Sequence, residues 1–210
     1  MGRNILLICG ILSSLLYVAM NIFIPLQWKE YSSFSQTVSE LSAIGAPTRQ
    51  LWVWLAMMYI MLYAAFGWGV LKSAYKNRRL HMVGILILIY CVINFYWPPM
   101  QLRGNEMALT DILHIIWAML ALLFMLLTMG FGAMALGKGF RQYTIASFVF
   151  FIVFGTLTGI KSPQLAANLP TPWMGVWERI NIGVFLLWVI VLAIVLLRLE
   201  KTKEPVKSTL

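Results

Sequence analysis

Two pairs of polar side chains have the spacing at which they can act together. Asp111 and His114 are three residues apart, as are Glu178 and Asn181, and residues at i and i+3 share one face of a helix. A carboxylate beside an imidazole orients the ring and raises its pKa, which suits a general base. The alternative is structural: Asp111 would stabilise the start of a helix, and His114 would be hydrogen-bonded at an interface.

Glu178 also has two interpretations. It is a second carboxylate of a site, or it is half of an ion pair that locks two helices. The chain offers three cationic partners for such a pair, which are Arg49, Arg103 and Arg179. An acid without a partner is disfavoured near lipid, so the residue types alone favour the ion pair.

Serine and histidine side chains are the candidate nucleophiles and metal ligands of the chain. Ser35 and Ser39 precede Glu40 in one segment, but the chain has no G-x-S-x-G elbow. The two histidines, His81 and His114, are 33 residues apart and show no H-x-x-x-H spacing, so we expect no metal site. No Walker or Rossmann glycine pattern occurs, and we expect no cofactor.

The hydropathy of the chain indicates which elements must position these residues. The chain is 61% hydrophobic and 11% charged, whereas a soluble domain has about 25% charged residues. Crossing a hydrocarbon core of ~30 Å takes about 20 apolar residues. We predict an all-α polytopic membrane protein with one domain, residues 1–200, and a polar cytoplasmic tail, residues 201–210. Its six transmembrane helices are expected at residues 4–26, 51–71, 80–97, 110–136, 143–160 and 180–199.

The charges between these runs are sorted to two sides. Of the 16 Lys and Arg residues, 11 fall on one side: Arg3, Lys72, Lys76, Arg78, Arg79, Lys138, Arg141, Arg198, Lys201, Lys203 and Lys207. The other side receives five bases and five of the seven acids. Short basic flanks of apolar runs orient a protein with its basic side in the cytoplasm, so we expect both termini there. They do not indicate a nucleic-acid partner.

The first loop on the neutral side contains a helical pattern. Ser33 and Gln36 have the spacing of a capping box, and Gly45 supplies a C-terminal stop. Apolar residues recur between them at helical spacing: Phe34, Val38 and Leu41. We predict a short amphipathic helix lying in the outer interface, either as a lid over a site or as a connector.

Polar residues inside the predicted helices lie mainly in the half nearest the neutral side. They are Asn21, Asn94, Asp111, His114 and Asn181. With Glu178 at the start of the sixth predicted helix, they outline a polar cup that opens toward the neutral side.

Three segments carry a family resemblance. S-E-L-S-A-I-G-A-P at residues 39–47, the early His114 of the fourth helix and W-E-R-I at residues 177–180 resemble a prokaryotic six-helix membrane family known as domain of unknown function 998. The resemblance covers most of the chain. It implies the fold and a multi-pass location in the prokaryotic inner membrane, but no reaction. The positions that it marks are Ser39, Glu40, Gly45, Pro47, His114, Glu178 and Arg179.

Three hypotheses for function follow. The first is an enzyme that processes a lipid-like or hydrophobic substrate by acid–base chemistry; its catalytic candidates are Glu40, His114 and Glu178, with Asp111 and Ser39 as further ones. Its substrate-binding candidates are Arg49, Arg103, Arg179, Asn94 and Asn181. The second is a transporter or ligand-binding protein, and the third is a structural or accessory subunit. The expected partners are membrane lipids and either a second copy or another membrane protein.

Overall fold

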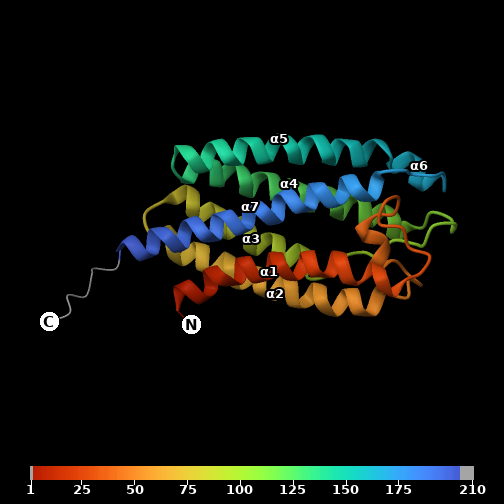
Figure 1. Cartoon of the computed structure of the whole chain (residues 1–210), viewed down its shortest axis with the longest axis horizontal. Coiled ribbons are helices and arrows are strands. Elements are labelled where there is room, and N and C mark those ends of the chain that lie inside the picture. Colours follow the sequence, from red (N-terminus) through yellow and green to blue (C-terminus); the bar gives the residue numbers. More distant parts are fainter. Residues whose placement is uncertain (1, 204–210) are drawn as a thin grey trace.

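The protein is a bundle of long helices that run along one axis (Figure 1). The structure is a computed structural model that describes residues 2–203. Within them the long helices are α1 Arg3–Phe23, α2 Arg49–Ala74, α3 Arg78–Asn94, α4 Leu109–Ala135, α5 Lys138–Ile160 and α7 Met174–Lys203. The connections contain the short helices η1 Pro25–Gln27, η2 Val38–Ser42 and α6 Ser162–Ala166. The described residues form no strand beyond an isolated bridge of Ile44 with Gln101, which confirms the all-α class.

Helix length and hydropathy agree with a multi-pass membrane protein. Five helices of the described chain are long and apolar enough to cross a membrane, and α3 lies beside them with 17 residues. Several helices extend beyond the predicted apolar runs; α5 begins at Lys138 and α7 at Met174. Hydropathy does not register polar residues that continue a helix through the interface. The predicted tail is helical up to Lys203, and residues 204–210 lie outside the described residues.

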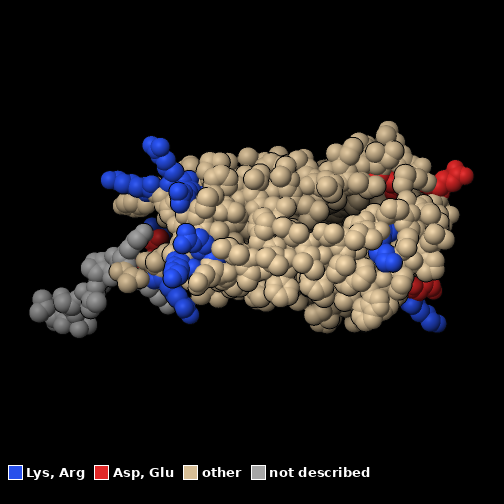
Figure 2. Space-filling view, turned by 90° about the horizontal axis from the view of Figure 1, so that it is seen from above, with Lys and Arg blue, Asp and Glu red and all other residues tan. Residues whose placement is uncertain are grey.

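The long helices form a ring in which each contacts the next along the chain. The order is α1, α2, α3, α4, α5 and α7, and α7 closes the ring against α1. At one end, α1 begins and α7 ends (Figure 1), and Figure 2 shows Lys and Arg side chains gathered there. We name this the basic end and the opposite end the loop end. The charge sorting of the sequence is therefore a property of the folded bundle.

One half of the ring is packed much more closely than the other. Gly69 of α2 lies so near α1 that a Cβ atom there would be 3.1 Å from the carbonyl carbon of Leu6. The most apolar 18-residue stretch of each long helix shows the contrast. In α4 and α5, 22% and 17% of that stretch is buried, against 39–44% in α1, α2 and α7. The α4 and α5 helices therefore present most of their apolar surface outward, where a membrane would cover it.

The first loop, residues 28–48, differs from the predicted amphipathic helix. Its helix η2 is a five-residue 3-10 helix, and Val38 and Leu41 are 3% and 0% exposed. They pack against apolar residues of α1 and α2 in the bundle. Phe34 instead lies against Trp173, with ring centroids 4.3 Å apart. The apolar residues thus contact protein on two sides, so the expected lipid-facing stripe does not form.

The cap of this short helix also differs from the prediction. The backbone N–H of Thr37 donates to Oε2 of Glu40 at 2.6 Å, and the Thr37 hydroxyl bonds the same oxygen at 3.0 Å. The side chain of Gln36 instead accepts from the backbone N–H of Ser32 at 2.7 Å. The capping role therefore belongs to Thr37 and Glu40 and not to Ser33 and Gln36, because the helix starts four residues later than expected.

Candidate functional site

Three arginines from different parts of the bundle bind the carbonyl groups of the first loop. Arg49, at the start of α2, donates to the Ser42 carbonyl. Arg103, from the α3–α4 connection, donates to the Ser35 carbonyl at 2.9 Å. Arg179 of α7 donates to the carbonyls of Ser33 and Gln36 at 3.0 and 3.1 Å. These bonds fasten the loop over the end of the bundle. The arginines proposed for substrate binding are thus engaged by the protein itself.

Glu40 is a buried carboxylate whose two oxygens are both occupied. Nε of Arg103 lies 2.6 Å from Oε1, and Nη2 lies 3.1 Å from Oε2. The Gln36 amide adds a bond of 3.3 Å to Oε1, and Glu40 is 1% exposed. A bidentate pair with further donors is the arrangement in which a buried carboxylate can stay charged. It joins the first loop to the α3–α4 connection.

Glu178 approaches the same turn from α7 but keeps one oxygen open. Its Oε2 accepts from the backbone N–H of Val38 at 2.6 Å, two residues before Glu40. Its Oε1 has no hydrogen-bond partner among the described residues, and the side chain is half-buried. The structure therefore brings Glu40 and Glu178 to adjacent backbone N–H groups at the start of η2, and they differ in how completely they are engaged.

Arg179 and Tyr31 form a second junction between α7 and the loop. Nη2 of Arg179 lies 2.6 Å from the Tyr31 hydroxyl, and the guanidinium carbon lies 5.6 Å from the centre of the ring. The hydroxyl donates to the Thr37 carbonyl at 2.7 Å. Burial raises the pKa of Tyr31, and the nearby Arg179 opposes this effect only in part. The hydroxyl therefore stays protonated and continues to donate.

His114 lies apart from the two carboxylates. Its Nδ1 is 2.6 Å from the Pro98 carbonyl, and because a carbonyl only accepts, Nδ1 carries the proton. The ring is 5.2 Å from that of Trp117. No hydrogen bond or ion pair within residues 2–203 joins His114 to Glu40 or Glu178. The expected three-residue cluster is thus divided between the loop and the α3–α4 side of the bundle.

Asp111 organises the start of α4. Its Oδ1 accepts from the Gln101 backbone N–H at 2.7 Å, and its Oδ2 accepts from that of Ala108 at 2.8 Å. Both bonds tie the α3–α4 connection to the first turn of α4. This is the structural role that its position near a helix N-terminus suggests, and the described bonds do not connect Asp111 to His114.

The asparagines of the predicted cup are engaged unequally. Asn94 donates to the Tyr90 carbonyl within α3 at 2.8 Å. Asn181 of α7 is 6% exposed, yet its Oδ1 has no hydrogen-bond partner within residues 2–203. Asn21 of α1 donates to the Tyr17 carbonyl at 3.0 Å, and its Oδ1 also has no partner among these described residues. Ser39 contributes its backbone carbonyl to a bond with the Ser42 hydroxyl. Asn181 therefore carries a buried open acceptor on the same helix as Glu178, one turn away from it.

The bundle is open at the side near these acceptors. Between Ala121 and the loop end, His114 is the one described residue of α4 that is buried. Between Phe151 and the loop end, no residue of α5 is buried. Gly155 of α5 lies against the Asn181 amide, 3.3 Å from where a Cβ would stand. Figure 2 shows the surface hollowed near this end.

Sequence reasoning missed several residues that build the site. Tyr31, Thr37 and Thr171 all bind the loop; the Thr171 hydroxyl donates to the Ser35 carbonyl at 2.8 Å. They are single polar residues in irregular segments, with no spacing that distinguishes them. Trp97 is a further one, since its indole N–H donates to the Ser42 hydroxyl at 3.3 Å. Among residues 2–203, no three His, Cys, Asp or Glu side chains gather as a metal site would require.

Comparison with known proteins gives a family and no function. No match exists among curated proteins, and none exists among solved structures. A family model described as "Protein of unknown function (DUF998)" matches residues 11–195. This range includes the 39–47 segment, His114 and the 177–180 segment on which the resemblance depended. Since the match covers most of the sequence, the chain belongs to the DUF998 family of proteins of unknown function.

Proposed function

We propose that the loop end binds a lipid-like amphiphile through the face of α7 that carries Glu178 and Asn181. The observation that supports this most is a pair of open acceptors one turn apart, Oε1 of Glu178 and the buried Oδ1 of Asn181. A buried acceptor without a donor costs about 1–3 kcal/mol. A bound molecule with N–H or O–H groups would remove that cost.

The engagement of the arginines defines the polar group further. Arg49, Arg103 and Arg179 donate to loop carbonyls, so part of their hydrogen-bonding capacity is already used by the protein. On the face of α7 that carries Glu178 and Asn181, the open atoms Oε1 and Oδ1 are acceptors. The proposed ligand therefore offers hydrogen-bond donors to this face, such as an ammonium or hydroxyl group.

Entry from the membrane is the route that this arrangement favours. The first loop covers the end of the bundle, whereas α4 and α5 leave their apolar surfaces open near the site. The apolar part of an amphiphile would lie against those surfaces, and its polar part would reach α7. An inward transport path has less support, because the core beyond the site is filled by Tyr63, Phe66 and Phe185, each at most 1% exposed.

Glu178 is the acid–base candidate within this proposal. A general acid or base must reach the proton that it transfers, and Glu178 has an open oxygen. Glu40 is held by Arg103 through both oxygens. His114 bonds Pro98 through Nδ1 and keeps Nε2 as an acceptor, but no bond among the described residues joins it to Glu178 or to the first loop. Glu178 is therefore the acid–base group beside Asn181, with Glu40 and Arg103 positioning the loop around it.

The orientation of the bundle belongs to the same proposal. The basic end would face the cytoplasm by the positive-inside rule, with both termini there and the loop end on the outer side of an inner membrane. The site would then meet the outer leaflet.

Photocrosslinking with two matched lipids tests the proposal. The full chain is reconstituted in nanodiscs with a photoactivatable phosphatidylethanolamine or with the corresponding phosphatidylcholine, which lacks N–H donors. We expect the first probe to label α4, α5 or α7 near the loop end, and the second to label much less. Asn181→Leu should reduce the labelling. The matched change Asn94→Leu should not, because Asn94 is bonded within its own helix. Equal labelling by both lipids, unaffected by Asn181→Leu, would overturn the proposal.

A further inference from the structure

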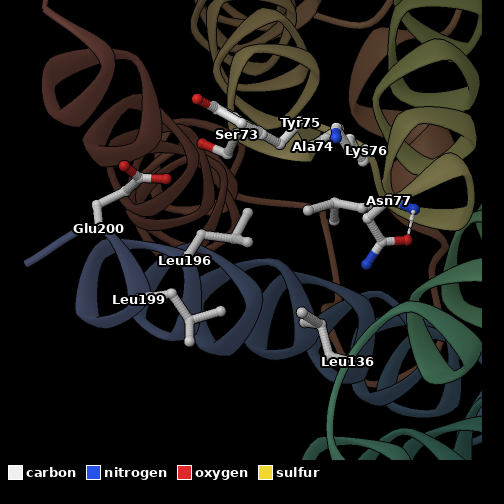
Figure 3. Close-up of a pocket in the computed structure, with 10 residues that line it drawn as sticks. Ser73, Ala74, Tyr75, Lys76, Asn77, Leu136, Leu196, Leu199 and Glu200 are labelled. Carbon is white, nitrogen blue, oxygen red and sulfur yellow. Dashed lines mark hydrogen bonds between the residues drawn. The ribbon is translucent and has the colours of Figure 1, made fainter. Parts of the chain in front are cut away.

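A cavity lined by both polar and apolar residues lies at the basic end, far from the site described above. It has a volume of about 250 Å³ and lies between the α2–α3 turn and the last turns of α7 (Figure 3). This is about eight times the ~30 Å³ that a water molecule occupies in the liquid. The residues lining it are Ser73, Ala74, Tyr75, Lys76, Asn77, Leu80, Leu136, Leu196, Leu199 and Glu200.

The lining divides into a polar side and an apolar side. Four leucines form the apolar side, and Figure 3 shows Leu196 of α7 directed toward Ser73, with Leu199 beside it on the same helix. The last turn of α2 supplies Ser73, and the α2–α3 turn supplies Lys76. Ser73 is 6% exposed, and its hydroxyl has no hydrogen-bond partner in the part of the chain that the structure describes. A cavity with a cation, a buried open hydroxyl and a leucine wall matches a molecule that is polar at one end and apolar at the other.

The charge balance favours an anion. Glu200, the acid that lines the cavity, forms an ion pair with Arg3 of α1. Lys76 is left as the cation of the lining, and Arg78 and Arg79 follow it in sequence. The cavity also adjoins the start of α3, where Asn77 caps the helix by accepting from the Leu80 backbone N–H at 3.1 Å. The positive end of a helix dipole adds to the attraction for an anion.

We propose that this cavity binds the phosphate-bearing head group of an anionic phospholipid from the adjacent leaflet. Lys76 pairs with the phosphate, and the Ser73 hydroxyl donates to one of its oxygens. The leucines contact the glycerol carbons and the first methylenes, while the acyl chains lie along the outside of the bundle. The leucine wall distinguishes a lipid from free phosphate, which has no apolar part. Clusters of basic residues beside membrane helices are typical of such sites.

Native mass spectrometry of the full chain in detergent tests this inference with three probes: phosphatidylglycerol, phosphatidylcholine and inorganic phosphate. We expect phosphatidylglycerol to remain bound at concentrations where phosphatidylcholine does not. Lys76→Gln should weaken its binding about fivefold, the usual effect of one lysine near a membrane surface, and Ser73→Ala should also weaken it. Lys138→Gln is the matched control, since Lys138 lies at the same end without lining the cavity.

The outcomes separate a lipid site from its alternatives. Loss of binding in Lys76→Gln and Ser73→Ala, but not in Lys138→Gln, supports the inference. Competition by inorganic phosphate at the same concentration as the lipid would overturn it, because the site would then not require the lipid. Equal losses for Lys76→Gln and Lys138→Gln would also overturn it, because a diffuse basic surface would then explain the binding. A melting temperature like that of wild type shows that each variant is folded. The result does not depend on the site at the loop end.

Discussion

The two ends of the bundle use their charged side chains in opposite ways. At the loop end, Arg103 and Arg179 are drawn into hydrogen bonds with the first loop, and Glu40 is 1% exposed. At the basic end, Arg78, Arg79 and Arg141 are exposed. At the loop end, arginines therefore fasten the first loop, whereas at the basic end exposed arginines accompany the ion pair of Arg3 with Glu200. Substitutions should have very unequal effects at the two ends.

The largest effect is expected from breaking the ion pair of Glu40 and Arg103. Removing one partner of a buried pair costs about 3–5 kcal/mol, because the other charge stays buried without compensation. Glu40→Gln alone should lower the thermal stability of the detergent-solubilised protein strongly. The double variant Glu40→Gln with Arg103→Met should recover part of the loss. Equal melting temperatures for Glu40→Gln and wild type would show that the pair does not hold the loop.

A smaller loss is expected where the first loop rests on α7. A Cβ on Gly175 would collide with the carbonyl oxygens of Gln36 and Ser33, so Gly175→Ala forces the loop away from the helix. Overpacking of this kind costs about 1–3 kcal/mol. Gly183, two turns along the same helix, has nothing within 4 Å of a Cβ position. Gly183→Ala is the matched control and should be neutral or slightly stabilising in the same melting experiment.

Arg179→Met should loosen the loop without unfolding the bundle. It removes donors to the Ser33 and Gln36 carbonyls and to the Tyr31 hydroxyl. Hydrogen bonds to charged groups contribute about 1.5–3 kcal/mol, and partial exposure places this residue at the low end. Hydrogen–deuterium exchange should increase in residues 31–40 and remain unchanged in α2 and α3. Uniform exchange changes along the chain would argue against a local fastening role.

The smallest effect is expected at the basic end. Arg141 is exposed near the start of α5, and surface substitutions away from special features change stability little. Arg141→Gln should therefore leave the melting temperature unchanged. A loss comparable to that of Arg179→Met would mean that the contrast between the two ends does not hold.

The sequence predicted the elements well because apolar runs and charge flanks are local signals. The all-α class, the long helices and the separation of basic and mixed ends all depend on residues close together in the chain. The resemblance carried by the 39–47 segment was confirmed by the family match. Helix ends were displaced where polar residues continue a helix, as at Lys138 and Met174.

The site was harder to predict because its contacts join distant segments. Glu40 with Arg103 and Glu178 with Val38 are separated by 63 and 140 residues, and no spacing in a single sequence reveals such pairs. The spacing of Asp111 and His114 did place them on neighbouring turns, but each bonds a different part of the α3–α4 connection. A spacing of three residues predicts that two side chains lie on one face of a helix. It does not predict the hydrogen-bond partner of either side chain.

The most direct test of the proposed site compares Glu178→Gln with His114→Gln in the phosphatidylethanolamine crosslinking experiment. Glu178 faces the proposed ligand with an open oxygen, whereas His114 is engaged by Pro98 on another side of the bundle. We predict that Glu178→Gln loses most of the labelling and that His114→Gln keeps it, with both variants folded. Equal loss in the two variants, or no loss in either, would contradict a site centred on Glu178 and Asn181.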